Sequence, residues 1–85
     1  MKKKYKKIDI YNEINEILIK SLRISNLKSF KTNKNHYKRW DSLMHLKIIM
    51  EIERKFKISF DVNEVFKFQN ADEIYKKTIS LLRIN

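Results

Sequence analysis

Apolar residues recur at the spacing of an α-helix in three stretches of the chain. The first stretch runs from about Asp9 to Arg23, and Asp9 is placed where an N-cap is expected. Its periodic positions are Ile10, Ile14, Ile17, Leu18 and Leu22. This pattern predicts a first long helix.

The second stretch has the clearest helical pattern, with Asp41 as the predicted N-cap and Phe56 near the end. Two apolar stripes run along it. The core stripe consists of Ile48, Ile49, Ile52 and Phe56, and the outer stripe consists of Leu43, Leu46 and Met50. Because a helix in so small a bundle needs only one stripe for the core, the outer stripe is available to a docking partner.

The third stretch opens at Asn70, and Glu73 three residues later forms an asparagine-based variant of the capping box. The helix is expected to end near Arg83. Its periodic positions are Ile74, Tyr75, Thr78, Leu81 and Leu82.

Two connecting segments remain. Residues 25–40 are polar and basic without a sustained period, which indicates a long loop with Leu27 and Phe30 as anchors to the core. Ile58, Phe60 and Val62 alternate as in a strand, but a lone strand has nothing to pair with. We therefore predict a loop that leads into a short helix around Asp61–Phe66.

These elements predict an all-α fold, a small bundle of three longer helices plus one short helix, with a long loop between the first and second helices. We divide the chain into a basic N-terminal tail, residues 1–8, and a single helical domain, residues 9–85. Glycine and proline are absent, so the turns must depend on Asn, Asp and Ser. A chain of 85 residues forms at most one domain, which excludes a multi-domain enzyme with a deep cleft.

Charge and composition narrow the function further. The 20 basic and 10 acidic residues give a net charge of +10, of which residues 1–7 supply +5 and residues 41–57 only +1. Such an excess is typical of proteins that bind nucleic acid or an anionic surface. The absence of cysteine excludes a disulfide framework and a thiolate nucleophile within the chain. No apolar run is long enough for a signal peptide or a membrane span, so we expect a cytoplasmic protein.

One serine lies in a position of chemical interest. Ser42 directly follows the Asp41 cap, in a first helical turn where free amides and the helix dipole favour an anion. A phosphate ester on Ser42 would be well placed. Serine in a first turn is nevertheless common in a purely structural role.

Residues 40–82 resemble the acyl carrier protein family. The resemblance begins with the Asp-Ser-Leu motif that marks the phosphopantetheine-bearing serine of that family, and it continues through the predicted short helix to the capped last helix. It is carried by Asp41-Ser42-Leu43, by Ile52, Glu53 and Phe56, by Ile58 and Phe60, by Asp61 and Glu64, and by Trp40 and His45 of a WDSLxH variant. This variant resembles carriers dedicated to a biosynthetic pathway outside primary fatty acid synthesis.

The resemblance implies an acyl-carrier-like helical domain without catalytic residues of its own. A phosphopantetheinyl transferase would move 4'-phosphopantetheine from coenzyme A onto Ser42, with Asp41 and Leu43 flanking the site. The cofactor's thiol would then hold an acyl or aminoacyl group as a thioester for acyl-loading and acyl-transfer enzymes. Such a carrier is expected to be a monomer, without a metal or nucleic acid. The residues expected to contact partners are Leu43, Leu46, Lys47, Met50 and Arg54.

The charge of the second helix departs from the family pattern. Typical carriers present carboxylates on this helix, whereas this chain carries Lys47, Arg54, Lys55 and Lys57 there alongside Glu51 and Glu53. Enzymes that depend on an acidic carrier would lose steering attraction. We expect partners with acidic or mainly apolar docking surfaces.

Other interpretations of the same residues remain open. His45 follows Ser42 by three positions, which suggests a serine–histidine dyad, but it also lies on the core stripe, so packing explains it better. His36 and His45 are too few for a zinc site. Trp40 is interpreted as a cover over the helix start.

The alternative function is a small basic module that binds nucleic acid. It would place basic residues of the tail and the loop against phosphates, and it would stack aromatic rings on bases. The basic residues are Lys2, Lys3, Lys4, Lys6, Lys7, Lys28, Lys31, Lys34, Lys38 and Arg39, and the rings are Phe30, Tyr37 and Trp40. No recognised nucleic-acid motif accompanies them.

Overall fold

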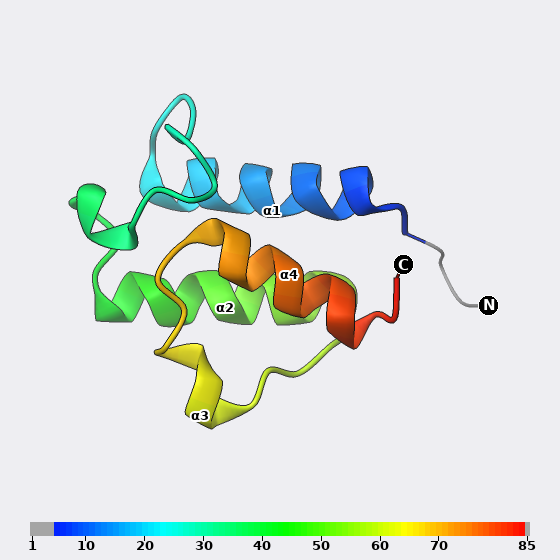
Figure 1. Ribbon diagram of the computed structural model, residues 1–85. Helices are drawn as coiled ribbons and strands as arrows, with labels where there is room; N and C mark the ends of the chain where they lie inside the picture. The colour runs from blue at the N-terminus through cyan, green and yellow to red at the C-terminus, as the bar shows by residue number, and fades with distance from the viewer. Residues whose placement is uncertain (1–4, 85) are drawn as a thin grey trace.

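The computed structural model describes residues 5–84, and every regular element in that range is helical. The elements are α1 (Lys7–Leu22), a 3₁₀ turn η1 (Lys34–His36), α2 (Ser42–Phe56), α3 (Val62–Val65) and α4 (Ala71–Leu81). Figure 1 shows the three longer helices with the short α3 at the lower edge and a long connection between α1 and α2. The predicted fold class is confirmed.

The core forms where α1 packs against both α2 and α4. α1 buries one residue from each turn: Ile10, Ile14, Leu18 and Leu22. The core stripe of α2 is buried as predicted, and Ile74 joins it from α4. Each such side chain contributes about 1.5–3 kcal/mol on burial. These contacts hold α2 in place and leave its other face to solvent.

The start of α1 differs from the prediction. The helix begins at Lys7 with Lys6 as the N-cap, and Asp9 is the third helical residue, where its carboxylate accepts a hydrogen bond from the Lys6 amide over 3.0 Å. An acidic residue serves either position, because both bring a carboxylate to the free amides of the first turn. Residues 7 and 8 therefore belong to the helix and not to the tail. Residues 1–4 of the predicted tail lie outside the described residues.

The ends of the three longer helices share a device that the sequence reading missed. A basic residue near each end takes positive φ: Arg23 (57°), Lys57 (54°) and Arg83 (55°). The next residue is always isoleucine, and its amide donates to the carbonyl five positions back, at Ile19, Glu53 and Ile79 respectively. In a chain without glycine, a basic residue thus occupies the left-handed position that glycine usually fills.

The long loop is fastened to the start of α4. The amide of Asp72 donates to the Phe30 carbonyl over 2.9 Å, and the amide of Lys34 donates to the Gln69 carbonyl over 2.7 Å. The Phe30 ring is buried and stacks on Tyr11 of α1 with centroids 3.9 Å apart. Phe30 is therefore an anchor as predicted, and Leu27 is partly buried against the core. The turn η1 inside the loop was not predicted.

The last two helices begin at the predicted caps. Asp61 caps α3, and the side chain of Asn70 accepts from the Glu73 amide over 2.9 Å at the start of α4. Glu73 accepts from the amide of Gln69 over 2.7 Å, one residue before the expected partner. α4 ends at Leu81, two residues short of the predicted end.

Between residues 5 and 84, no helix combines the length and apolar character needed to cross a membrane. Over the same range, no three acidic, histidine or cysteine side chains gather closely enough to hold a metal ion.

Candidate functional site

The start of α2 is organised by the Asp41 cap. The Asp41 carboxylate accepts from the Met44 amide over 2.9 Å, and its backbone carbonyl accepts from the His45 amide over 2.8 Å. Ser42 is the first residue of the helix, and it is exposed. Its hydroxyl is accordingly accessible to a partner enzyme, next to first-turn amides that favour a phosphate.

Beneath this turn lies a buried hydrogen-bonded group, which we call the latch: the Trp40 indole, the His45 imidazole and the Val65 carbonyl. The indole N–H donates to His45 Nδ1 over 2.9 Å, and His45 Nε2 lies 2.6 Å from the Val65 oxygen. The side chains are only 4% and 1% exposed. An indole N–H can only donate and a carbonyl can only accept, so His45 is neutral, with its proton on Nε2.

Several groups set the pKa of His45. Burial lowers the pKa below the ordinary value of 6.5, because the protonated ring would lose its hydration. The hydrogen bond to the Val65 carbonyl acts in the opposite direction, and the positive charge of Lys34 lowers the pKa further. The neutral form required by the latch is therefore the form that the surroundings favour at neutral pH.

The latch also decides between the two interpretations of His45. Both ring nitrogens are engaged, one by Trp40 and the other by Val65, so neither is directed to Ser42. The structure supports the packed histidine and not a serine–histidine dyad. Trp40 covers the helix start as predicted, and it also donates the hydrogen bond that orients His45.

The outer stripe of α2 faces solvent. Leu43 is 71% exposed and Met50 is 49% exposed, with Leu46 between them in the sequence. Val62 at the start of α3 and Phe66, directly after its end, are also 75% and 52% exposed. The Phe66 ring lies 5.8 Å from the His45 ring, which brings it to the Ser42 end of α2. Sequence reasoning placed both residues in a short helix around Asp61–Phe66 and assigned neither of them to a surface.

The basic residues of α2 differ in their surroundings. Arg54 pairs with Glu51 at 3.0 Å within the helix, and Lys55 pairs with Glu13 of α1 at 3.0 Å. The hydrogen bond to Glu13 raises the pKa of Lys55. For exposed Lys47, no ion pair is found with any residue of the described range. Lys55 therefore joins two helices, and Lys47 presents the less compensated charge.

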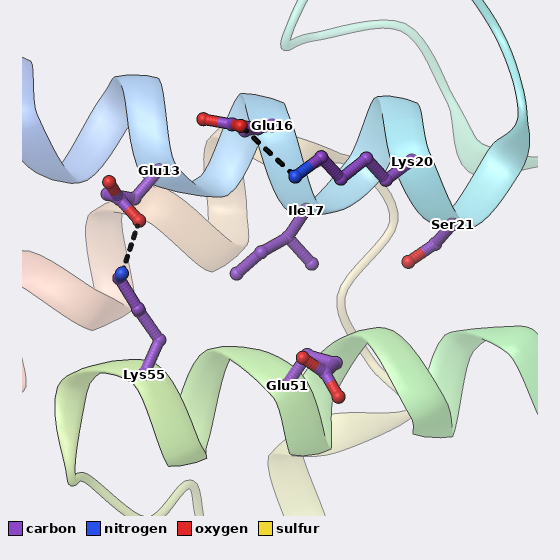
Figure 2. Close-up of a pocket in the computed structure, with 7 residues that line it drawn as sticks. All are labelled: Glu13, Glu16, Ile17, Lys20, Ser21, Glu51 and Lys55. Carbon is purple, nitrogen blue, oxygen red and sulfur yellow. Dashed lines mark ion pairs between the residues drawn. The ribbon is translucent and has the colours of Figure 1, made fainter.

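A cleft with a volume of about 370 Å³ lies between α1 and α2. Figure 2 shows two ion pairs at the cleft: Lys55 of α2 pairs with Glu13 of α1 across it, and Lys20 pairs with Glu16 at 3.2 Å along α1. Its lining residues are Glu13, Glu16, Ile17, Lys20, Ser21, Glu51 and Lys55. None of them belongs to the predicted attachment site or partner surface.

The structure also bears on the nucleic-acid alternative. Two of its three proposed stacking rings, Phe30 and Trp40, are buried in the core. The third, Tyr37, is half-buried, and its hydroxyl accepts a hydrogen bond from the Lys28 amide over 2.9 Å. Base stacking on the two buried rings would require the fold to open, so the structure gives this alternative little support.

A comparison with family models matches residues 40–77 to the family described as phosphopantetheine attachment site. The matched segment starts at Trp40, contains all of α2 and α3, and reaches into α4. The searches of curated proteins and of solved structures found no significant match. The match agrees with the resemblance carried by the Asp-Ser-Leu motif. The cofactor of a phosphopantetheine attachment site is covalently attached 4'-phosphopantetheine.

Proposed function

We propose that Ser42 bears phosphopantetheine and that the chain works as an acyl carrier protein, a proposal supported by the match of residues 40–77 to the phosphopantetheine attachment family. The observation that carries this proposal is the coincidence of three features on one residue. Ser42 lies within the matched segment, it belongs to the Asp-Ser-Leu motif, and it is an exposed serine in the first turn of a long helix.

The surroundings of Ser42 fit a phosphodiester. Asp41 satisfies the Met44 amide, and the helix dipole places partial positive charge at this end of α2. In the attachment step, the Ser42 oxygen forms a bond to the phosphate that carries pantetheine. The phosphoanhydride bond of coenzyme A breaks, adenosine 3',5'-bisphosphate leaves, and a base of the transferase takes the hydroxyl proton.

A carrier role explains why the chain needs no catalytic group of its own. The attached group supplies a terminal thiol, on which an acyl or aminoacyl group is held as a thioester. The chain presents Ser42 at an exposed corner and orders the helix that follows it. We propose a carrier and not an enzyme, serving a dedicated biosynthetic pathway in the cytoplasm as a monomer.

The proposed partner surface consists of the outer stripe with Lys47 and Arg54. Its apolar centre is exposed, and exposed Phe66, whose ring lies near the His45 ring, adds an apolar side chain at the Ser42 end of α2. Because Arg54 already pairs with Glu51, Lys47 is the cation best placed to act on a partner. We expect the phosphopantetheinyl transferase and the acyl-handling enzymes to meet this surface with apolar groups and with carboxylates opposite Lys47.

Intact-mass measurement tests the attachment site. The purified chain is incubated with coenzyme A and a broad-specificity phosphopantetheinyl transferase, and Ser42→Ala is compared with Ser59→Ala, which alters an exposed loop serine. Wild type and Ser59→Ala should gain the mass of one phosphopantetheine, and Ser42→Ala should gain none. No gain in wild type with several transferases, together with salt-dependent binding of nucleic acid, would favour the alternative function.

A further inference from the structure

The latch connects α3 to the residue two positions before Ser42. We propose that His45 is a positioning residue: in its neutral form it holds Trp40 and the turn before Ser42 against α3, and in its protonated form it releases them. The chain would thereby present Ser42 in an acid-sensitive way. The hydrogen-bonding part of this proposal depends on the latch alone, whereas the effect on loading also depends on the proposed function of Ser42.

Geometry makes the latch specific for neutral His45. Nδ1 must accept from the indole over 2.9 Å while Nε2 donates to the Val65 carbonyl. A second ring proton would sit on Nδ1 and face the indole N–H, so two donors would point at each other. Protonation leaves the bond to Val65 intact and breaks the bond to Trp40. The His45 ring would then stay with α3 and lose its hold on the loop.

The groups around the His45 ring make the loss of the Trp40 hydrogen bond costly when the ring is protonated. Trp40 and His45 are almost fully buried, so water does not readily replace the lost bond, and an unpaired buried donor is costly. The element η1 contributes the charge of Lys34, which opposes a second positive charge. α3 contributes the uncharged Val65 carbonyl and the Phe66 ring. On α2, the carboxylate of Asp41 is one turn away and is engaged by the Met44 amide.

The released segment leads directly to the attachment site. The Trp40 amide donates to the Tyr37 carbonyl over 3.0 Å, and the residue after Trp40 is the cap of α2. A transferase must recognise Asp41 and Ser42 in a fixed arrangement, because catalysis depends on the placement of the attacking hydroxyl. Release of Trp40 should therefore slow loading without unfolding the helices.

The chain provides its own probes for the latch, because it contains one tryptophan and two histidines. Nuclear magnetic resonance can follow the single indole N–H and both imidazoles as pH is lowered. We expect His45 to titrate below the ordinary histidine value of 6.5, and the indole N–H to lose its protection from hydrogen exchange over the same pH range as His45. Far-UV circular dichroism should stay constant across this range.

Trp40→Phe provides a second test that leaves His45 unchanged. Removing the indole removes a hydrogen bond that stabilises the neutral ring, so the titration midpoint of His45 should rise. The proposal is overturned if the indole N–H stays protected while His45 becomes protonated, or if Trp40→Phe leaves the His45 midpoint unchanged.

Loading rates then connect the latch to Ser42. The rate of phosphopantetheine transfer is measured for wild type, His45→Gln and the matched control His36→Gln with the same transferase, whose own pH dependence cancels in the ratios. The transfer rates of wild type and of His36→Gln are each divided by the rate of His45→Gln at the same pH. Both ratios should fall by about tenfold as pH falls through the His45 midpoint. A constant ratio contradicts the effect on loading. Should His45→Gln fail to fold, wild type is compared with Trp40→Phe, which has no indole to release. The transfer rate of wild type should then fall by the same factor relative to that of Trp40→Phe.

These outcomes separate the two proposals. If no variant is modified at Ser42 at any pH, the proposed function fails, and the titration of the indole and of His45 still tests the latch. If Ser42 is modified and the indole ignores the protonation of His45, the latch fails and the carrier function stands.

Discussion

The two faces of α2 carry similar side chains and have opposite surroundings. The core stripe is almost completely buried against α1 and α4, whereas Leu43 and Met50 of the outer stripe are largely exposed. Polar residues could replace the outer stripe without loss of any core contact. Leaving apolar side chains exposed beside Ser42 suggests that the outer stripe serves binding and the core stripe serves folding.

Ile49 of the core stripe and Met50 of the outer stripe are adjacent in the sequence, and substituting each should give the largest difference between the two faces. Ile49→Ala should lower the free energy of unfolding by about 2–5 kcal/mol, because it removes a buried side chain and leaves a cavity. Met50→Ala should change it by less than about 0.5 kcal/mol and should instead slow loading. Urea denaturation and transfer rates measure both effects. Equal destabilisation by the two variants would mean that the faces are not distinct.

Asp41 contributes to both folding and the candidate site, because it caps α2 and directly precedes Ser42. Asp41→Ala should lower the free energy of unfolding by about 0.5–2 kcal/mol, since the Met44 amide loses its partner. Asp41→Asn retains a good cap and should stay close to wild type. Urea denaturation gives the stabilities. If Asp41→Asn is stable but loads slowly, the carboxylate itself is recognised; if Asp41→Ala is as stable as wild type, the cap has no energetic role.

The charge on the outer face can be tested with one substitution. Lys47→Glu should reduce the association rate with a partner that presents carboxylates, by a few-fold at low salt and less at high salt. Lys31→Glu makes the same change of net charge in the long loop and serves as the control. Stopped-flow association kinetics provide the measurement. If both variants slow association equally, net charge and not the outer face is responsible.

Lowering the pH should reduce the stability of the fold through His45, the residue of α2 that is hydrogen-bonded to α3. The pKa of His45 is lowered in the folded chain, so the unfolded chain binds the proton more readily. The free energy of unfolding should therefore decrease as pH falls below about 6.5, until the lowered folded pKa is passed. His45→Gln should lose this part of the pH dependence, and His36→Gln should keep it. Urea titrations at several pH values measure the slope, and identical slopes in all three chains would contradict this expectation.

Local patterns predicted most of the fold. In α2, the cap and the periodicity agreed, so its start was predicted to the residue and its end near Phe56. Asp9 was misplaced because a cap and a third helical residue look alike in sequence. The left-handed conformation at the helix ends was missed, because Arg23 and Lys57 fill the position where glycine is the usual sign.

The candidate site was predictable only where it is local. The three-residue Asp-Ser-Leu motif is enough to make Ser42 the candidate attachment residue, and the outer stripe follows from spacing along α2. The latch depends on Val65, twenty residues beyond His45, and no spacing rule connects the two. Phe66 likewise reaches the site through the packing of α3. Long-range contacts of this kind need the folded chain.

The central claim is that phosphopantetheine is attached to Ser42. After loading with coenzyme A and a phosphopantetheinyl transferase, the chain is digested and its peptides are sequenced by tandem mass spectrometry. We predict a single modified residue, Ser42, in the peptide that contains Trp40 and Asp41. Phosphopantetheine on another residue, or a fully loaded chain with unmodified Ser42, would contradict the account.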